Sequence, residues 1–497
     1  MPSRLRLTDE QRRAAAANTA RAFIEAAPGS GKTTVAAERC GVLRYDHVGD
    51  GHGVLAVSFT RSATSELKGR ITGRWGSDAL AWPHRTTTLD SLYGDLVGHL
   101  LRTGRIQWPG GHTDLQVLDV WRGRPGCRLL MPGNLFRRVA TLRGTQVVST
   151  SERVVYPGYG IGQRVHFDGQ LAGGVCTHSE VRQVLAAALE DPALRAMVTK
   201  HLAETVKAVV VDEVFDANDL DLEIVGLVCE AGIPTTLIGD PWQALYGFRG
   251  ARPELVPGLL TRFGFPTYPV SQSFRFETAQ MRRLAAALRA GEPVRLSAGN
   301  VDEVDVVLAS KWDTLWDGPD TILPLSFGTI DNQTDAAMTL LVHWLVVGHF
   351  SREAIYLAEA IALLGLDRDM VDEREAEALA PAIKTLRSVG PLEQALHQLR
   401  DAVLDLGGYR RPRQLGAGQE GRQLGRLAAM RNRLAHPKLV PGMTVHQAKG
   451  REWAHVGVRL TDAELAQLAA GLSEEIDDDR RLYVALTRAR RSVTLIR

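Results

Sequence analysis

A glycine-rich turn between an apolar stretch and a helix start constrains the fold of this chain more than any other feature. Residues 23–35 read Phe-Ile-Glu-Ala-Ala-Pro-Gly-Ser-Gly-Lys-Thr-Thr-Val. Small residues let backbone N–H groups wrap around phosphate oxygens, and the following helix N-terminus adds partial positive charge. Lys32 can reach the β- and γ-oxygens of a triphosphate, and the Thr33 hydroxyl can ligate Mg²⁺. The pattern predicts a strand, a phosphate-binding loop and a helix; the simpler alternative is a glycine turn that caps an ordinary helix.

A later apolar run ends on two carboxylates. Residues 208–211 are Ala-Val-Val-Val, and Asp212 and Glu213 follow them. A strand that delivers an Asp beside a phosphate loop can hold the water shell of Mg²⁺, and the next Glu can orient and deprotonate an attacking water. Further along, Gln243 is placed to sense a γ-phosphate. An apolar run before Asp-Glu is a weak signal alone, but it supplies the carboxylates that the loop lacks.

Aromatic and hydroxyl residues follow other expected strands. A buried strand is predicted over residues 54–59, and it leads into Thr60 and Arg61. Residues 86–92 open a helix, for which hydroxyl residues such as Thr88 are ordinary caps. Phe248 and Arg249 offer an aromatic face and a cation to a nucleic-acid strand, although a packed core phenylalanine is the alternative.

Composition bounds the class of protein. At 497 residues the chain is long enough for two to four domains, and a net charge of +2 confines any nucleic-acid surface to a local patch. Cys40, Cys127, Cys176 and Cys229 lack C-x-x-C spacing, which argues against zinc or iron–sulfur ligation and fits a reduced cytoplasm. The N-terminus lacks the apolar segment of a signal peptide, and the longest apolar run, near residues 340–347, is too short to span a bilayer. We therefore expect a soluble, cytoplasmic protein without a membrane segment.

Local patterns give further expectations. We expect a helix over residues 3–22, strands over 164–167, 304–308 and 321–327, and a capping box at 177–180 before a helix over 181–189. Residues 351–435 are expected to be mainly helical, and their last third is basic. That basic run is either a solvated face or a phosphate-tracking patch. Its members are Arg410, Arg411, Arg413, Arg422, Arg426, Arg431, Arg433 and Lys438, against Glu420 alone.

In their order and spacing, these blocks resemble the motifs of UvrD/Rep-like superfamily 1 DNA helicases. The similarity runs collinearly from Leu7 to Arg490. The most specific blocks are residues 239–251, Gly-Asp-x-x-Gln-x-x-Tyr-x-aromatic-Arg-Gly-Ala, and residues 487–489, Thr-Arg-Ala. The matching segments also include Gln11, residues 26–33, Phe59-Thr60, residues 88–91 and residues 212–218.

The resemblance implies an α/β fold with two RecA-like P-loop domains, parallel sheets flanked by helices, each carrying a mainly helical insertion. It implies a first domain over 1–94 and 206–270 with an accessory subdomain at 95–205. It further implies a second domain over 271–350 and 436–497, with a short basic insertion at 351–435. ATP and Mg²⁺ would bind between the two domains, and hydrolysis would drive 3′→5′ translocation along single-stranded DNA or a 3′-tailed duplex.

The resemblance also assigns roles to residues. The catalytic set is Lys32, Glu213, Gln243, Arg275 and Arg488, with the two arginines as fingers from the second domain. Nucleotide would be bound by Gln11, Ala27, Pro28, Gly29, Ser30, Gly31, Lys32, Thr33, Thr34, Phe274 and Glu452. Gln11 would read adenine, on which Phe274 would stack, and Glu452 would lie near the ribose. Mg²⁺ would be held by Thr33 and Asp212, and DNA by Phe59, Thr60, Arg61, Thr88, Tyr246, Phe248, Arg249, His446 and Lys449.

The sequence departs from the family pattern in three places. Ala26 replaces a common Gly, which is a small-for-small change. Phe215 replaces the Gln of Asp-Glu-x-Gln-Asp, which removes a polar contact expected to link hydrolysis to the second domain. The 351–435 insertion is shorter than the family's second accessory domain, which bears on strand separation more than on ATP hydrolysis. The chain ends soon after residue 490, so we expect no nuclease module beyond it.

Two alternatives stay open at this point. One is a nucleotide-binding subunit of a DNA repair or anti-phage defence complex, with a protein partner and little unwinding of its own. The other is an unrelated P-loop nucleoside triphosphatase in which the later motifs are coincidental.

Overall fold

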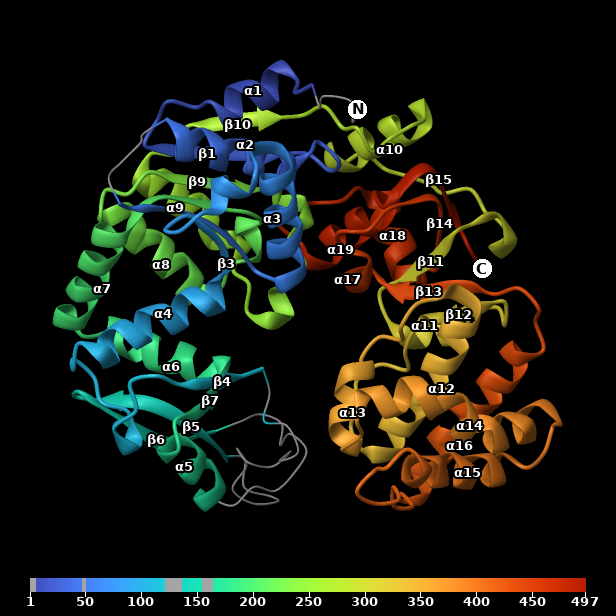
Figure 1. Ribbon diagram of the computed structural model, residues 1–497. Helices are drawn as coiled ribbons and strands as arrows, with labels where there is room; N and C mark the ends of the chain where they lie inside the picture. Colours follow the sequence, from blue (N-terminus) through green and yellow to red (C-terminus); the bar gives the residue numbers. More distant parts are fainter. Residues whose placement is uncertain (1–5, 47–50, 120, 122–135, 154–163) are drawn as a thin grey trace. The chain divides into compact units, whose positions relative to one another are not determined.

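The computed structural model describes residues 6–46, 51–119, 121, 136–153 and 164–497 (Figure 1). The chain forms two compact units. The described residues within 1–121, 126–275 and 474–480 make up the first unit. Those within 276–473 and 481–497 make up the second. No helix in the described part of the chain is long and apolar enough to cross a membrane.

The first unit is built on a six-stranded, all-parallel sheet with the order β10-β1-β9-β8-β2-β3. Its strands are β1 (Arg21–Ala26), β2 (Gly53–Ser58), β3 (Arg85–Thr88), β8 (Val206–Val211), β9 (Thr235–Gly239) and β10 (Thr267–Val270). The flanking helices are α1 (Asp9–Ala15), α2 (Lys32–Tyr45), α3 (Arg61–Trp75), α4 (Leu89–Arg102), α8 (Asp219–Glu230) and α9 (Val256–Phe263). Short 3₁₀ turns lie at 77–80, 109–111, 214–216, 241–243, 247–249 and 253–255.

Two apolar clusters cover the two faces of this sheet. Ile24, Val210 and Ile238 point into a cluster formed with α1, α2 and α3. The alternate strand residues Phe23 and Val209 point into a larger cluster that includes α4 and α8. A sheet buried on both faces needs apolar residues at successive positions, which is why its strands read as continuous apolar runs.

Helix α1 is shorter than the sequence suggested, so the prediction of one helix over residues 3–22 is wrong. The helix ends at Ala15, and β1 already begins at Arg21. The cause is Arg39 of α2, which is 3% exposed and whose Nη1 donates to the carbonyls of Ala15 and Ala17 at 3.2 and 2.7 Å. These carbonyls are bonded from outside the helix and do not continue it.

The segment inserted between α4 and β8 contains both strands and helices. Its elements are β4 (Gln116–Leu118), β5 (Phe136–Arg143), β6 (Gln146–Arg153), α5 (Arg164–Ala172), β7 (Val175–Thr177), α6 (His178–Leu189) and α7 (Pro192–Thr205). Strands β5 and β6 form an antiparallel hairpin, and β4 pairs with β7 in parallel. The capping box between Thr177 and Glu180 is confirmed. The predicted strand at 164–167 is wrong, because Phe167 and Leu171, four residues apart, are both buried along one face of helix α5.

The second unit contains a five-stranded parallel sheet with the order β12-β13-β11-β14-β15. Its strands are β11 (Val306–Ala309), β12 (Ile322–Pro324), β13 (Val440–Thr444), β14 (Trp453–Val458) and β15 (Ala489–Leu495). Near the sheet lie α10 (Ala279–Arg289), α11 (Trp312–Trp316), a 3₁₀ turn at 301–303, α17 (Val445–Ala448), α18 (Asp462–Ala470) and α19 (Asp477–Leu486). The expected fold class, parallel sheets flanked by helices in two RecA-like domains, is confirmed.

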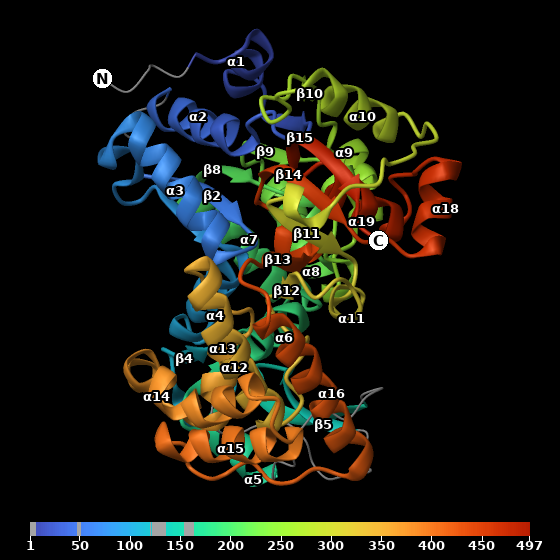
Figure 2. The same ribbon diagram turned by 90° about the vertical axis from the view of Figure 1, so that its right-hand side faces the viewer.

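A helical bundle separates β12 from β13 in the sequence. It comprises α12 (Gln333–Phe350), α13 (Leu357–Leu364), α14 (Arg368–Arg387), α15 (Leu392–Asp405) and α16 (Ala417–Leu434), which group together in both views (Figures 1 and 2). Helix α12 packs against α13, α14 and α15, so the bundle begins near residue 333, earlier than the boundary at 351 suggested by the sequence. The exact division of the whole chain into four segments stays a prediction.

Candidate active site

The motif residues of the first unit lie at one edge of its sheet. Ser58 pairs with Thr88 in register, Val57 with Val211, and Ala26 with Val270. Because all six strands are parallel, the segments that follow them leave from the same edge. Ligands of open parallel α/β sheets bind outside the carboxyl ends of the strands. The candidate site is therefore the edge where residues 27–31, 59–60, 212–213, 240–243 and 271–275 meet.

The glycine-rich turn between β1 and α2 has the geometry expected of a phosphate-binding loop. Gly29 and Gly31 have positive φ angles of 71° and 83°, which strongly favour glycine. Ser30 is fully buried, and its Oγ has no hydrogen-bond partner among the described residues. A buried hydroxyl without a partner costs free energy unless a ligand or water completes it. The loop thus offers a buried donor and a helix N-terminus to an anion.

Residues 271–275 close against this loop. The Ser273 hydroxyl donates to the Pro28 carbonyl at 2.7 Å, and the Phe274 N–H donates to the Gly29 carbonyl at 2.9 Å. A Cβ added to Gly29 would lie 2.4 Å from Cβ of Arg275. The Phe274 side chain is 57% exposed. Sequence reasoning assigned this segment to the second domain, but these contacts place it with the first unit, so Arg275 lies beside the phosphate loop of its own unit.

Lys32 and Glu213 face each other at the start of α2. The Nζ atom of Lys32 lies 3.1 Å from Oε1 of Glu213, and the two side chains are 11% and 24% exposed. Glu213 has φ 59°, an uncommon backbone conformation for a residue with a side chain. Such strain persists where the surrounding structure holds it, and it is common at functional sites. The side chains expected to act as phosphate-binding cation and as general base are therefore adjacent.

Asp212 lies at the end of β8 next to this pair. Its backbone N–H continues the strand by donating to the Val57 carbonyl at 3.0 Å. Burial raises the pKa of Asp212 to about 7, with Glu213 adding to the rise and Lys32 opposing it. A second positive charge beside Asp212 would favour its ionised form. Carboxylate and hydroxyl oxygens are the donors that Mg²⁺ prefers, so Asp212 and Thr33 fit the predicted metal site chemically. Among the described residues, no cluster of three or more His, Cys, Asp or Glu side chains forms a metal site by itself.

Gln11 supports the phosphate loop directly. Its Nε2 donates to the Ser30 carbonyl at 2.8 Å, and its Oε1 accepts from the Thr8 backbone N–H at 2.9 Å in a capping box. Gln11 is 4% exposed, and a Cβ added to Gly31 would lie 3.0 Å from its Nε2. The predicted adenine contact by Gln11 stays a prediction, and the observed role is to position the loop. Thr34, the other predicted nucleotide contact beyond Thr33, accepts from Nη1 of Arg70 at 3.0 Å.

Gln243 is fixed at the end of β9. Its Nε2 donates to Asp240 Oδ2 at 2.7 Å, and its side chain is buried. Nearby, Phe215 occupies the position where the family pattern has Gln. Phe215 is 5% exposed, lies 6.1 Å from the ring of Phe23 edge-to-face, and packs where a Cβ of Gly239 would otherwise lie. The substitution therefore exchanges a polar side chain for core packing.

The predicted DNA contacts of the first unit follow β2, β3 and β9. Thr60 and Thr88 cap helices α3 and α4 by accepting from the N–H groups of Ala63 and Ser91. Arg61 is exposed and forms a two-pronged ion pair with Asp119 at 3.0 and 2.5 Å. Phe59 is partly buried against the larger apolar cluster.

Tyr246 and Phe248 lie in the segment after Gln243. Their ring centroids are 6.1 Å apart, and Phe248 is 67% exposed, so it is not a core phenylalanine. The side chain of Arg249 lies outside the described structure. The Nε of Arg480 at the start of α19 donates to the Ala244 carbonyl at 3.0 Å. Sequence reasoning did not single out Arg480, Ser273 or Arg39, because a side chain that bonds a distant carbonyl has no local pattern.

The remaining predicted residues belong to the second unit. His446 and Lys449 lie at and just after α17, and Glu452 is exposed before β14. Arg488 is 1% exposed, and its Nε donates to the Val484 carbonyl at 3.1 Å. The structure thus places Lys32, Asp212, Glu213 and Arg275 around one loop, and it places Arg488 in the other unit. The roles of all of these residues stay predictions.

The phosphate loop, the two following carboxylates and the two parallel sheets define a P-loop α/β protein. Family comparison makes this assignment specific. Residues 7–99 and 177–263 match the UvrD/REP helicase N-terminal domain, and residues 424–497 match the UvrD-like helicase C-terminal domain. The chain belongs to the UvrD/Rep-like helicase family.

Individual relatives agree with this assignment. The chain is 27% identical over 296 residues to DNA helicase II of Salmonella typhimurium, an alignment that covers 57% of this chain and 40% of that protein. It is 27% identical over 571 aligned positions to the ATP-dependent DNA helicase UvrD2 of Mycobacterium tuberculosis, covering 97% of this chain and 77% of the relative. A solved arterivirus nonstructural protein 10 helicase in complex with DNA aligns with a TM-score of 0.33 and 13% identity. That alignment covers 98% of this chain and 62% of that one, and a similarity this low supports no inference about function.

Proposed function

We propose that this chain is an ATP-driven DNA motor that moves 3′→5′ along single-stranded DNA and opens duplexes with a 3′ tail. The observation that carries the proposal is the meeting of Lys32, Asp212 and Glu213 beside a loop whose buried Ser30 hydroxyl has no partner in the described part of the chain. These residues offer a cation, a metal ligand and a general base to one triphosphate. Membership of the UvrD/Rep-like family and the names of the relatives support DNA as the track.

The chemistry follows from where these charges lie. A triphosphate on the loop competes with Glu213 for the ammonium of Lys32, so nucleotide binding releases the Glu213 carboxylate. The released carboxylate can accept a proton from the attacking water. Thr33 and Asp212 would hold Mg²⁺, which neutralises charge on the β- and γ-phosphates when bound.

The leaving γ-phosphate spreads negative charge over its oxygens, and fixed cations must meet that charge. The Cβ atom of Arg275 lies beside Gly29, and the Arg275 guanidinium is one proposed source of the positive charge. Arg488 is the second proposed source, and Gln243 is the proposed sensor of the γ-phosphate. Phe274, exposed and anchored to the loop through its backbone, is proposed to stack on adenine, with Gln11 and Glu452 as further nucleotide contacts.

The DNA strand is proposed to follow the same edge of the first sheet. Phe248 offers an exposed ring there, and Phe59, Thr60, Arg61 and Thr88 follow the neighbouring strands. The other proposed contacts are Tyr246, Arg249, His446 and Lys449. Because the nucleotide sensor Gln243 and the ring of Phe248 share one short segment, a change at the γ-phosphate has a direct route to the strand. No observation on the described residues favours the alternative of a subunit without motor activity.

An ATPase assay with and without single-stranded DNA tests the proposal. We expect slow basal hydrolysis and a marked increase when a single-stranded oligonucleotide is added. Strand displacement from 3′-tailed and 5′-tailed duplexes then tests direction, and only the 3′-tailed duplex should be opened. An ATP hydrolysis rate that does not change when DNA is added would contradict the proposed motor function. Equal opening of the 3′-tailed and 5′-tailed duplexes would contradict the proposed polarity.

A further inference from the structure

A strongly exposed aromatic side chain lies in the helical bundle of the second unit, outside every residue assigned above. Tyr409 is 82% exposed, on the segment 406–416 that joins α15 to α16. Arg410, Arg411 and Arg413 follow it closely in the sequence. An aromatic face and cations are the two kinds of group that single-stranded nucleic acid binds, and this segment carries both within five residues.

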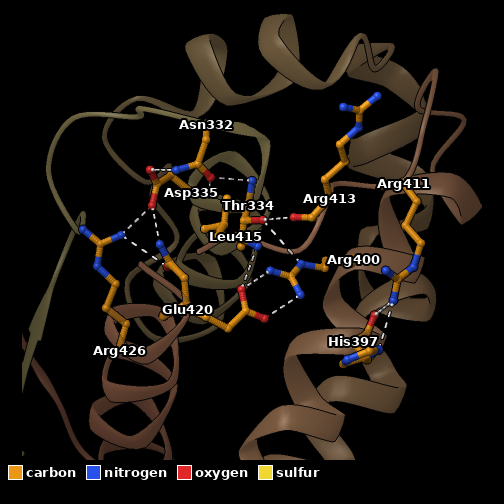
Figure 3. A network of polar contacts seen from close by, with 11 residues as sticks. Asn332, Thr334, Asp335, His397, Arg400, Arg411, Arg413, Leu415, Glu420 and Arg426 are labelled. Atoms are coloured by element: carbon orange, nitrogen blue, oxygen red, sulfur yellow. Dashed lines mark hydrogen bonds and ion pairs between the residues drawn. The ribbon is translucent and has the colours of Figure 1, made fainter. Parts of the chain in front are cut away.

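The segment that carries this ring is fixed to the bundle. The Tyr409 ring packs against Gly365 at the end of α13: a Cβ added to this glycine would lie 1.9 Å from Cε2 of Tyr409. Gly365 has a φ of 67°. Pro412 is buried, and the Leu415 N–H donates to Glu420 at 3.1 Å. Glu420 in turn receives both Nη atoms of Arg400, a fully buried arginine, at 2.8 and 2.7 Å. Figure 3 shows the contacts that join Arg400, Glu420 and Leu415.

The basic residues of this region differ in their contacts. Several side chains turn inward. Arg426 pairs with Asp335 at 2.7 Å, Arg433 donates to the Ile322 carbonyl at 2.6 Å, and Arg431 donates to the Gly390 carbonyl. Neither interpretation of the sequence, a solvated face or a phosphate-tracking patch, predicted these contacts. Arg411 is held by Asp401 and His397. These arginines are structural.

Arg410 and Arg413 differ from that group. Both are exposed, and Arg410 Nε donates to Gln333 Oε1 at 3.2 Å. In Figure 3 the Arg413 side chain points away from the network, while its backbone carbonyl faces Thr334. Two exposed arginines therefore follow an exposed ring within four residues, on a segment that the bundle already holds in place.

We propose that Tyr409, Arg410 and Arg413 form a contact site for single-stranded nucleic acid, in which an unpaired base stacks on the Tyr409 ring and the arginines bind neighbouring phosphates. The site rests on the proposed function and adds a contact on the bundle. A ring can stack only on a base whose face is free, so the site selects single strands over duplex. The arginines add an attraction that falls with salt.

Photo-crosslinking tests the stacking contact on the full chain. A single-stranded oligonucleotide carrying 5-iodouracil at successive positions is irradiated with the protein, and the crosslinked peptides are identified by mass spectrometry. We expect a crosslink to the peptide that contains Tyr409, retained in Tyr409→Phe and lost in Tyr409→Ala. A crosslink pattern that omits this peptide at every position would overturn the proposal.

Equilibrium binding gives a second measure. Loss of one stacked base weakens binding by about five- to a hundredfold, so Tyr409→Ala should bind single strands correspondingly less well and Tyr409→Phe nearly as well as wild type. Arg413→Gln should lower the slope of log affinity against log salt by about 0.7, the value for one phosphate contact on a single strand. Arg374→Gln, an exposed arginine of α14 in the same bundle, is the matched control and should leave the slope unchanged.

The outcomes separate this proposal from the proposed function. If wild type binds single strands and Tyr409→Ala binds them equally well, only the new site is wrong. If Tyr409→Ala loses affinity for blunt duplex as strongly as for single strands, the site is a duplex contact and the stacking proposal is overturned. If wild type binds no single-stranded DNA, the proposed function fails and this site fails with it.

Discussion

At the scale of single residues, Glu213 combines an uncommon backbone conformation with a cationic partner. Its φ of 59° turns the side chain out of the strand direction of β8, and its carboxylate lies 3.1 Å from Lys32 Nζ. This ion pair holds the proposed phosphate-binding cation and the proposed general base next to each other. The same two groups can therefore separate when a more highly charged partner, a triphosphate, approaches Lys32.

Replacing Glu213 separates binding from chemistry. In Glu213→Gln the ammonium of Lys32 loses its anionic partner, so affinity for ATP should be kept or should rise. Turnover should fall by about 10²–10⁴, the usual worth of a general base. Binding of a fluorescent ATP analogue and steady-state hydrolysis measure the two effects. Lys32→Ala should lose both, and the exposed Glu190→Gln should change neither; a Glu213→Gln protein that no longer binds ATP would show a structural carboxylate instead.

Replacing Arg275 tests whether its guanidinium supplies positive charge to the γ-phosphate. The residue contacts the loop through Cβ, beside Gly29, and Arg275→Ala keeps that atom. Hydrolysis should slow by about 10³–10⁵, and the melting temperature of the variant shows whether the fold is kept. Arg275→Lys should recover only part of the rate, since an ammonium lacks the planar fork of a guanidinium. Arg283→Ala, an exposed arginine on α10, is the control, and a near-normal rate for Arg275→Ala would remove it from the catalytic set.

At the scale of helices and strands, the sequence predicted the elements whose patterns are local. The loop, β2, β8 and the Thr177–Glu180 cap appear where the pattern of residues placed them. The predictions were wrong where contacts between residues far apart in the sequence determine the local structure. Arg39 ends α1 early, α5 forms where a strand was expected, and α12 joins the bundle because Asp335 and Thr334 meet Arg426 and Arg400 from far along the chain. Short polar segments carry too little periodicity to reveal such contacts.

Helices α12 and α14 meet through a buried pair of titratable side chains. His343 Nε2 lies 3.8 Å from Glu375 Oε2, and His343 Nδ1 accepts the Ala354 N–H. Burial raises the pKa of Glu375 to about 8, with Asp372 adding to the rise and Arg368 opposing it. Burial also lowers the pKa of His343, so His343 does not supply a compensating charge at neutral pH.

This pair predicts a pH dependence of stability. Because the folded pKa of Glu375 lies above its unfolded value of about 4.3, folding at pH 7 takes up a proton. The contribution of this group to stability is greatest below pH 4 and declines as the pH rises towards 8. Glu375→Gln should therefore raise the melting temperature more at pH 8 than at pH 5, by about 2–4 °C for each kcal/mol relieved. Glu359→Gln, exposed on α13, is the control; a larger effect at pH 5 would reverse the sign and contradict the assignment.

At the scale of the whole molecule, the sequence predicted two parallel-sheet units and the order of their motifs, because a collinear motif set fixes topology. It could not predict which unit holds residues 271–275. Ser273 and Phe274 bond the loop carbonyls of Pro28 and Gly29, more than 240 positions away in the sequence, and only the folded chain reveals that. The phosphate loop is therefore braced by a segment that leads directly into the second unit at Phe276.

Coupling between DNA and ATP in the whole molecule can be tested at Phe248. Its ring is 67% exposed, so truncation removes little packing, and Phe248→Ala should keep the melting temperature and the basal ATPase of wild type. Loss of a stacked base should weaken single-stranded DNA binding by about five- to a hundredfold, and the DNA concentration needed for half-maximal stimulation of the ATPase should rise in step. Fluorescence anisotropy with a labelled oligonucleotide and the stimulated ATPase measure both, with Trp82→Ala, an aromatic side chain 90% exposed on the same unit, as the matched control. Unchanged DNA affinity at low salt would show that the strand does not pass Phe248, because weakening must appear wherever a base has lost its stacking partner.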